Sequence, residues 1–82
     1  FRAERRRTAA HGALIEALRD FFAGSYARAE KNVNRAVALG EPGDLGAVIA
    51  ARAAHELRAP DRREGYLARQ PADPAKPDAA LA

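Results

Sequence analysis

Two histidines, His11 and His55, are the side chains best suited to metal or haem chemistry, because an imidazole nitrogen ligates transition metals and haem iron. Neither is followed four residues later by a second ligand, and Glu56, next to His55, does not share its helix face. The chain has no cysteine, which excludes a thiolate zinc site and a Cys-x-x-Cys-His haem attachment. We therefore expect both histidines to be partly exposed helix residues, and we expect no metal and no cofactor.

Carboxylates are the second group that could carry chemistry, as general acids or bases. Glu16 and Asp20 are four residues apart and share a helix face, but they flank Arg19, which is typical of a solvated face. No nucleophile and no oxyanion site accompany them. We therefore expect no catalytic residues and no enzyme activity. The carboxylates considered are Glu16, Asp20, Glu30, Glu56 and Glu64.

Basic residues gather at the start of the chain, whose formal net charge is +3. Residues 1–41 hold eight Lys or Arg against five acids, whereas residues 42–82 hold six against six. The excess comes from Arg2, Arg5, Arg6 and Arg7, which only Glu4 opposes. Such a cluster is a candidate contact for nucleic acid or an anionic membrane, and a solvated helix face is the more ordinary interpretation.

The first half of the chain predicts two helices, at about residues 8–23 and 26–39. Apolar residues recur at i, i+3, i+4 and i+7 in the first segment, and in the second Tyr26, Ala29, Val33 and Ala36 share one face. Gly24 ends the first helix and Ser25 is suited to cap the second, which ends at Gly40 and Pro42. The arginine segment is a candidate extension of the first helix. The predicted apolar stripe of the first helix is Leu14, Ala17, Leu18 and Phe21, widened by Ile15 and Phe22.

The second half predicts helices at about 45–58 and 60–69, which complete a domain of residues 1–70. Asp44 is suited to cap the third helix, and Pro60 to open the fourth, where its missing N–H is harmless. The fourth presents Leu67, with Tyr66 beside it. Residues 71–82 predict a Pro/Ala-rich linker or tail, with a candidate start of a further helix at its end. The third helix's stripe is Val48, Ile49, Ala53 and Leu57, with Ala50 and Ala54 alongside.

A sequence repeat relates the two halves of the chain, and its offset equals the period of the tetratricopeptide repeat (TPR), about 34 residues. Ile15 is matched by Ile49, and Ala17 by Ala51. The spacing predicts an all-α fold of antiparallel helical hairpins of TPR type, forming a short right-handed α-solenoid. The predicted structural positions of this repeat are Gly24, Tyr26, Ala29, Val33, Ala36, Pro60, Tyr66 and Leu67.

Arg19 and Arg52 lie at similar points of the two hairpins' first helices, which line the concave surface in a TPR protein. They are candidate partner-binding residues for acidic groups, and the alternative is that they face solvent. Asn32 and Asn34 fall on a second helix, whereas TPRs that grip a partner's carboxylate use first helices. We therefore expect the two asparagines to be exposed polar positions.

Three stretches carry a resemblance to a known family: Ala23–Lys31, Ala50–Leu57 and above all Asp61–Arg69, where an Arg-Arg-acid-small-Tyr-Leu run is not generic TPR sequence. Over about residues 8–70 the chain resembles the N-terminal soluble TPR region of the HemY family. It departs from the family at Arg58-Ala59-Pro60, where Gly-Asp-aromatic is usual, and in the tail from Pro71.

The resemblance implies a non-catalytic protein-interaction scaffold associated with late protohaem IX (porphyrin) biosynthesis at the bacterial inner membrane. Its partners would be other proteins, among them haem-biosynthesis enzymes, and the parent would be membrane-anchored upstream of residue 1. This chain would be a soluble fragment, on a side of the membrane that the sequence leaves open. The alternatives are a generic TPR adaptor unrelated to haem, and a basic helical module that contacts nucleic acid or anionic lipid. We expect no nucleic-acid partner, and a homo-oligomer is a further candidate state.

Overall fold

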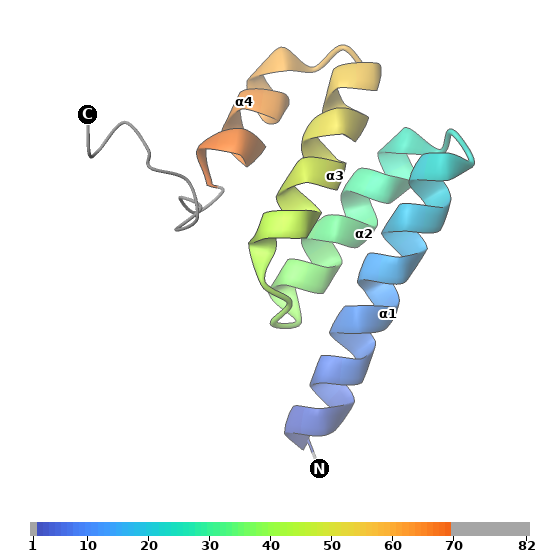
Figure 1. Ribbon diagram of the computed structural model, residues 1–82, viewed down its shortest axis with the longest axis vertical. Coiled ribbons are helices and arrows are strands. Elements are labelled where there is room, and N and C mark those ends of the chain that lie inside the picture. The colour runs from blue at the N-terminus through green and yellow to red at the C-terminus, as the bar shows by residue number, and fades with distance from the viewer. Residues whose placement is uncertain (1, 70–82) are drawn as a thin grey trace.

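The prediction of an all-helical chain is confirmed over residues 2–69, the part that the computed structural model describes (Figure 1). The four helices there are α1 (Arg2–Phe22), α2 (Tyr26–Ala38), α3 (Gly43–Glu56) and α4 (Pro60–Ala68). Each lies within a few residues of its predicted bounds, except that α1 begins earlier than predicted. The predicted linker or tail at residues 71–82 lies outside the described residues.

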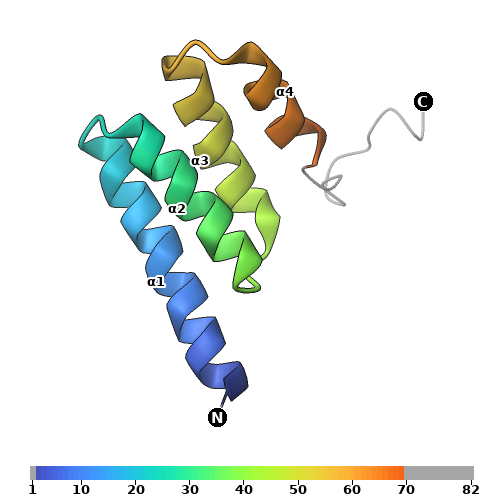
Figure 2. The same cartoon turned by 180° about the vertical axis from the view of Figure 1, so that it is seen from behind.

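The helices follow one another up and down and pack side by side in chain order (Figures 1 and 2). α1 packs on α2, α2 on α3, and α3 on α4, while α1 also touches α3. The short α4 lies on the far side of α3 from α1 (Figure 1). The described part of the chain is therefore two antiparallel helical pairs, α1–α2 and α3–α4, and α3 lies where the two pairs meet.

Glycines end two of the helices as the sequence predicts. Gly24 and Gly40 have φ angles of 80° and 109°, a left-handed conformation that costs glycine little. The predictions of the N-cap residues of α2 and α3 are less accurate. Ser25 precedes α2 but makes no capping hydrogen bond with its side chain. Pro42, not Asp44, precedes α3, and Asp44 lies inside the first turn, where its negative charge complements the helix dipole.

The arginine segment is helical, so α1 begins at Arg2 rather than near Thr8. Arginine, glutamate and alanine all have high helix propensity. The Arg6 guanidinium also reaches α2, where it donates to the carbonyl oxygens of Ala38 (3.0 Å) and Leu39 (3.3 Å). This contact fixes the first turns of α1 against the end of α2.

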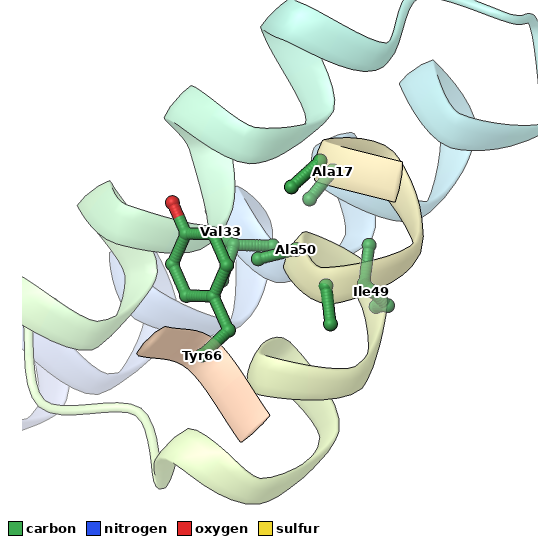
Figure 3. Packing of buried hydrophobic residues seen from close by; sticks show 7 residues of the cluster. Ala17, Val33, Ile49, Ala50 and Tyr66 are labelled. Atoms are coloured by element: carbon green, nitrogen blue, oxygen red, sulfur yellow. The ribbon is translucent and has the colours of Figure 1, made fainter. Parts of the chain in front are cut away.

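Alanine, not the bulky apolar residues, forms most of the core (Figure 3). The predicted stripe of α1 is wrong in part, because the side chains of Ile15, Leu18 and Phe22 are exposed, that of Phe22 by 79%. α1 instead buries a stripe of small residues, which lets its neighbours approach closely. The buried residues of α1 are Ala10, Ala13, Ala17 and Asp20.

In the second pair, too, some bulky apolar side chains that were predicted to be buried are exposed. The predicted stripe of α3 is wrong at Val48 and Leu57, which are exposed, and is confirmed at Ile49 and Ala53, which are buried. On α4, the Tyr66 ring packs beside Val33 in the core with 6% exposure, whereas Leu67 is 44% exposed (Figure 3). The predicted equivalence of Val33 and Leu67 therefore does not extend to burial, because Val33 is only 2% exposed.

Candidate partner-binding surface

A polar cluster joins α2 to α4. The Glu30 carboxylate is 8% exposed and accepts a hydrogen bond from the Tyr66 hydroxyl (2.6 Å). It also accepts two from the Arg62 guanidinium, at 2.8 and 3.4 Å. The Asn34 amide donates to the Tyr66 oxygen at 3.0 Å. Burial and the hydrogen bond to Glu30 raise the pKa of Tyr66, because both disfavour the phenolate.

The cluster changes the interpretation of two asparagines. Asn34 takes part in it, and Asn32 donates to the Asp20 carboxylate at 2.7 Å, which links α2 to α1. The prediction that both are exposed is confirmed for Asn34, which nevertheless makes a hydrogen bond, and is wrong for Asn32, which is half-buried. The signal available in the sequence was spacing, because Asn32 and Asn34 stand within four residues of the buried Glu30. All of these groups satisfy one another, so the cluster holds helices together rather than offering a free reactive group.

A shallow hollow of about 230 Å³ lies between the outer faces of α3 and α4. It includes Arg52, one of the two predicted partner-binding residues, which is exposed and forms no side-chain hydrogen bond or ion pair within residues 2–69. The complete lining is Val48, Ala51, Arg52, His55, Arg63 and Leu67. The hollow therefore combines an apolar floor with basic side chains.

Arg63 is the most constrained residue of this hollow. One terminal nitrogen lies 3.2 Å from His55 Nδ1, and the other donates to the Glu64 carboxylate at 2.8 Å. Its Nε is buried and finds no partner in the described part of the chain. A buried N–H without an acceptor is costly, so this atom marks a place where an acceptor from outside would be stabilising.

Arg19, the other predicted partner-binding residue, lies elsewhere. It is exposed on α1 and donates to Glu16 at 3.3 Å, in the preceding turn. Arg19 does not line the hollow that includes Arg52. A role for either in binding a partner stays a prediction, and the structure links only Arg52 to a concave surface.

The histidines lie on different surfaces. His11 Nδ1 is 3.0 Å from the Glu41 carboxylate, and His55 lies in the hollow beside Arg63. Over residues 2–69, no three histidine or carboxylate side chains come together as a metal site would need. Within the same span, no helix is long and apolar enough to cross a membrane.

The family model described as the HemY protein N-terminus matches residues 1–58, which span α1, α2 and α3. This chain belongs to the HemY family. The match confirms the resemblance seen in the sequence and associates the chain with haem biosynthesis. It ends before Asp61–Arg69, the stretch that we took as most distinctive. Searches of curated proteins and of solved structures found no match.

Proposed function

We propose that this HemY-family chain is a TPR-type, non-catalytic scaffold that binds enzymes of late protohaem IX biosynthesis at the bacterial inner membrane. The observation that carries the proposal is a repetition of burial at the spacing of the sequence repeat. Ala13 and Ala47 are buried, and so are Ala17 and Ala51. A helical-hairpin repeat of this period builds extended surfaces for other proteins rather than a closed active site.

The packing of α3 on the first pair supports the same proposal. Gly46 of α3 lies so close to α2 that an added Cβ would be 3.0 Å from Val33 Cγ1. Ile49 and Ala50 share a core cluster with Ala17 and Val33. The packing of α3 on α2, with a smaller contact to α1, supports stacking of successive helical hairpins.

The test is direct capture of purified haem-biosynthesis enzymes, offered one at a time, by the full-length parent protein. We expect at least one enzyme to bind the parent, and the present chain alone to bind it more weakly, with an affinity on the order of micromolar, because its binding surface is small. Charge reversal of Arg19 and Arg52 should weaken this capture without reducing helix content in circular dichroism. If none of the enzymes binds, the proposal that this scaffold serves haem biosynthesis is wrong.

Haem titration separates a scaffold from a haem-handling protein. We expect no saturable Soret shift at one equivalent of haem, because Arg63 places a positive charge 3.2 Å from His55 Nδ1. That charge disfavours coordination of ferric haem iron by the imidazole of His55. A stoichiometric shift that is lost in His55→Ala would replace the scaffold proposal with haem binding.

The basic-module alternative has less support. Arg6 of the arginine cluster is engaged with α2 carbonyl oxygens, which occupies one of its four positive charges in an intramolecular contact. A generic TPR adaptor remains the second candidate, and the capture experiment distinguishes it from a haem-pathway scaffold.

A further inference from the structure

The first helical pair uses most of its acids in internal contacts and leaves most of its cations free. Residues 1–41 hold eight Lys or Arg and five acids. Four of these acids take part in hydrogen bonds with other side chains, and only Glu4 has none within residues 2–69. Six of the eight cations form no side-chain hydrogen bond or ion pair in that span. These six, all exposed, are Arg2, Arg5, Arg7, Arg28, Lys31 and Arg35.

The second pair does not share this imbalance. Between residues 43 and 69, Arg52 and Arg58 form no side-chain hydrogen bond or ion pair with described residues, and neither do the acids Asp44, Glu56 and Asp61. Free charges of both signs therefore offset one another on α3 and α4. The positive charge of the chain is concentrated on α1 and α2.

Three of the free cations form a row along α2. Arg28, Lys31 and Arg35 follow one another at i, i+3 and i+7, so they are neighbours on one helix face. From the helical rise, the row spans about 10 Å. Beside it on α2 lie only small exposed side chains, those of Ala27 and Ala38. The charges of the row are therefore fully accessible.

The start of α1 extends this row. The hydrogen bonds from Arg6 to the last carbonyl oxygens of α2 place the first turns of α1 at the end of α2, and these turns project beyond it (Figure 1). Arg2 lies about five helical turns before Asp20, so both are on one face of α1. Asp20 accepts a hydrogen bond from Asn32, which is a neighbour of the row. We call Arg2, Arg5, Arg28, Lys31 and Arg35 the basic face.

The helices of the second pair lie against other sides of α2. Gly46 of α3 is close to Val33, and Tyr66 of α4 donates to Glu30. Because hairpins of a solenoid stack in one direction, any hairpin that follows α4 extends the stack away from α2. The basic face is therefore not the surface on which the fold continues.

The rest of the chain also lacks the charge to neutralise the basic face. Residues 70–82 hold two acids and one base, a net charge of −1 against the five positive charges of the face. A hairpin that precedes α1 would stack at Gly12 and Ile15, the repeat counterparts of Gly46 and Ile49, which are not part of the face. A second copy of the chain has the same positive charge and is repelled.

The composition of the basic face favours a membrane surface as its counterpart. Its five positions are Arg or Lys, with alanines beside them and no aromatic residue, whereas protein interfaces are enriched in aromatic residues and depleted in lysine. Single-stranded nucleic acid is bound through aromatic stacking, and duplexes are read by side chains that reach base edges. An anionic bilayer requires only that several cations, typically about four to eight, lie on one side of the protein.

We propose that the basic face of α1 and α2 lies against the anionic phospholipid headgroups of a membrane. The proposal rests on the scaffold function above, which puts the chain at the inner membrane, and it specifies which side of the chain faces the lipid. Arg28, Lys31 and Arg35 contact the headgroup phosphates, and Arg2 and Arg5 extend the contact along α1. The arrangement turns α3 and α4 away from the bilayer.

Co-sedimentation of the whole chain with lipid vesicles tests the proposal. We expect binding to vesicles of phosphatidylcholine mixed with phosphatidylglycerol, and none to vesicles of phosphatidylcholine alone. Added salt should release the chain, because it screens exposed charges. Lys31→Glu should weaken binding at least about tenfold, because the new carboxylate repels the headgroups and also pairs with Arg28 and Arg35 on the same helix face.

Arg58→Glu is the matched control, because Arg58 is exposed in the turn between α3 and α4 and the change in net charge is the same. It should leave vesicle binding within about twofold of the unmodified chain, since screening weakens the effect of a distant charge. Circular dichroism should give equal helix content for both variants. An equal loss of binding in Arg58→Glu would reduce the effect to general charge attraction and overturn the proposal.

Three further results would also overturn it. The first is failure to bind the phosphatidylglycerol vesicles, and the second is equal binding to both kinds of vesicle. The third is release from the vesicles by a short DNA duplex at stoichiometric concentration, which would assign the basic face to nucleic acid. If the vesicles are not bound while the parent captures a haem-pathway enzyme, this inference fails and the scaffold function stands. If the vesicles are bound and no enzyme is captured, the scaffold function fails alone.

Discussion

The residues of α1–α2 match those of α3–α4 at the offset of the sequence repeat, but the two helical pairs pack differently. In α1–α2, the residue at the crossing is Ala29, which is completely buried, and the groove beside it is filled by α3. In α3–α4, the same position is Arg63, whose side chain is 38% exposed, and the groove beside it is open. The two pairs therefore differ in the residue at this matched position, a buried alanine in the first and a partly exposed arginine in the second, and in that α3 covers the face of the first pair.

A second difference lies in how the outer helix of each pair is held. α2 packs through Ala29, Val33 and Ala36, all nearly inaccessible to solvent. α4 buries a single residue, Tyr66, whose hydroxyl reaches across to Glu30 of α2. The first pair is therefore held mainly by close apolar packing, and the second depends on a polar bridge to its neighbour.

The largest expected effect comes from enlarging Gly46, where α3 meets α2. Because an added Cβ would lie 3.0 Å from Val33 Cγ1, Gly46→Leu should push α3 away and lower the free energy of unfolding by about 3 kcal/mol. Its counterpart in the first pair, Gly12, has no atom within 4 Å of such a Cβ. Gly12→Leu should therefore stabilise the chain by about 0.5–1 kcal/mol through helix propensity. Chemical denaturation measures both, and equal effects would contradict the stacking of α3 on the first pair.

The next effect tests the crossing residues. Ala29→Leu overfills a site with no exposed surface and should destabilise the chain by about 2 kcal/mol in thermal or urea unfolding. Arg63→Leu should change stability by less than about 0.5 kcal/mol or raise it, because it removes a buried Nε that has no partner within residues 2–69. If Arg63→Leu proves as damaging as Ala29→Leu, the two crossings are packed alike and the comparison fails.

Much of the helical layout was predictable because its determinants are local. Gly24 and Gly40 adopt the left-handed conformation expected at helix ends, and Pro60 lies in the first turn of α4. The repeat spacing also placed Ala17 and Ala51 at matching points, and both are buried. These features depend on backbone preference and periodicity, which a single sequence displays directly.

Which face of each helix is buried was harder to predict, because it depends on the helices that pack against it. Ile15, Leu18 and Phe22 made the predicted stripe of α1 too wide, since apolar periodicity weighs large residues above the alanines that allow close approach. The partner of Glu30 was not predictable either, as Tyr66 lies far along the chain and its orientation depends on how α4 sits on α3. Arg52 was placed on the first helix of the second pair, but the hollow that it lines also needs Arg63, which the repeat comparison did not single out.

Tyr66→Phe tests the polar bridge of the second pair. It removes the hydroxyl that donates to Glu30 and accepts from Asn34, so we expect a loss of about 1–2 kcal/mol in unfolding free energy.

The hydrogen bond between Tyr66 and Glu30 also predicts that the stability of the chain depends on pH. Because the folded state raises the pKa of Tyr66 above 10.0, the folded chain keeps a proton that the unfolded chain loses. Its contribution is complete below pH 10.0 and declines as the pH rises through the folded-state pKa.

Unfolding measured from pH about 8 to about 11 separates this contribution from other alkaline effects. The decline should be shallower in Tyr66→Phe than in the unmodified chain. Tyr26→Phe is the matched control, because Tyr26 lies against the Phe21 ring and makes no hydrogen bond to Glu30. It should keep the full decline that Tyr66 causes. Identical pH profiles for the two variants would show that Tyr66 does not hold its proton through the bridge.

The smallest expected effect concerns Arg6, which contrasts with Arg63. The Arg6 guanidinium donates to two carbonyl oxygens at the end of α2, at 3.0 and 3.3 Å, where the negative end of the helix dipole favours a positive charge. Arg6→Ala should cost about 0.5 kcal/mol, and the loss should shrink in high salt because the contact is exposed. Arg5→Ala, which removes a neighbouring exposed charge without a bond to α2, should have no measurable effect on unfolding. An equal loss in both variants would mean that the cluster acts through its overall charge. A loss confined to Arg6 would mean that its hydrogen bonds to α2, and not the overall charge of the cluster, stabilise the first pair.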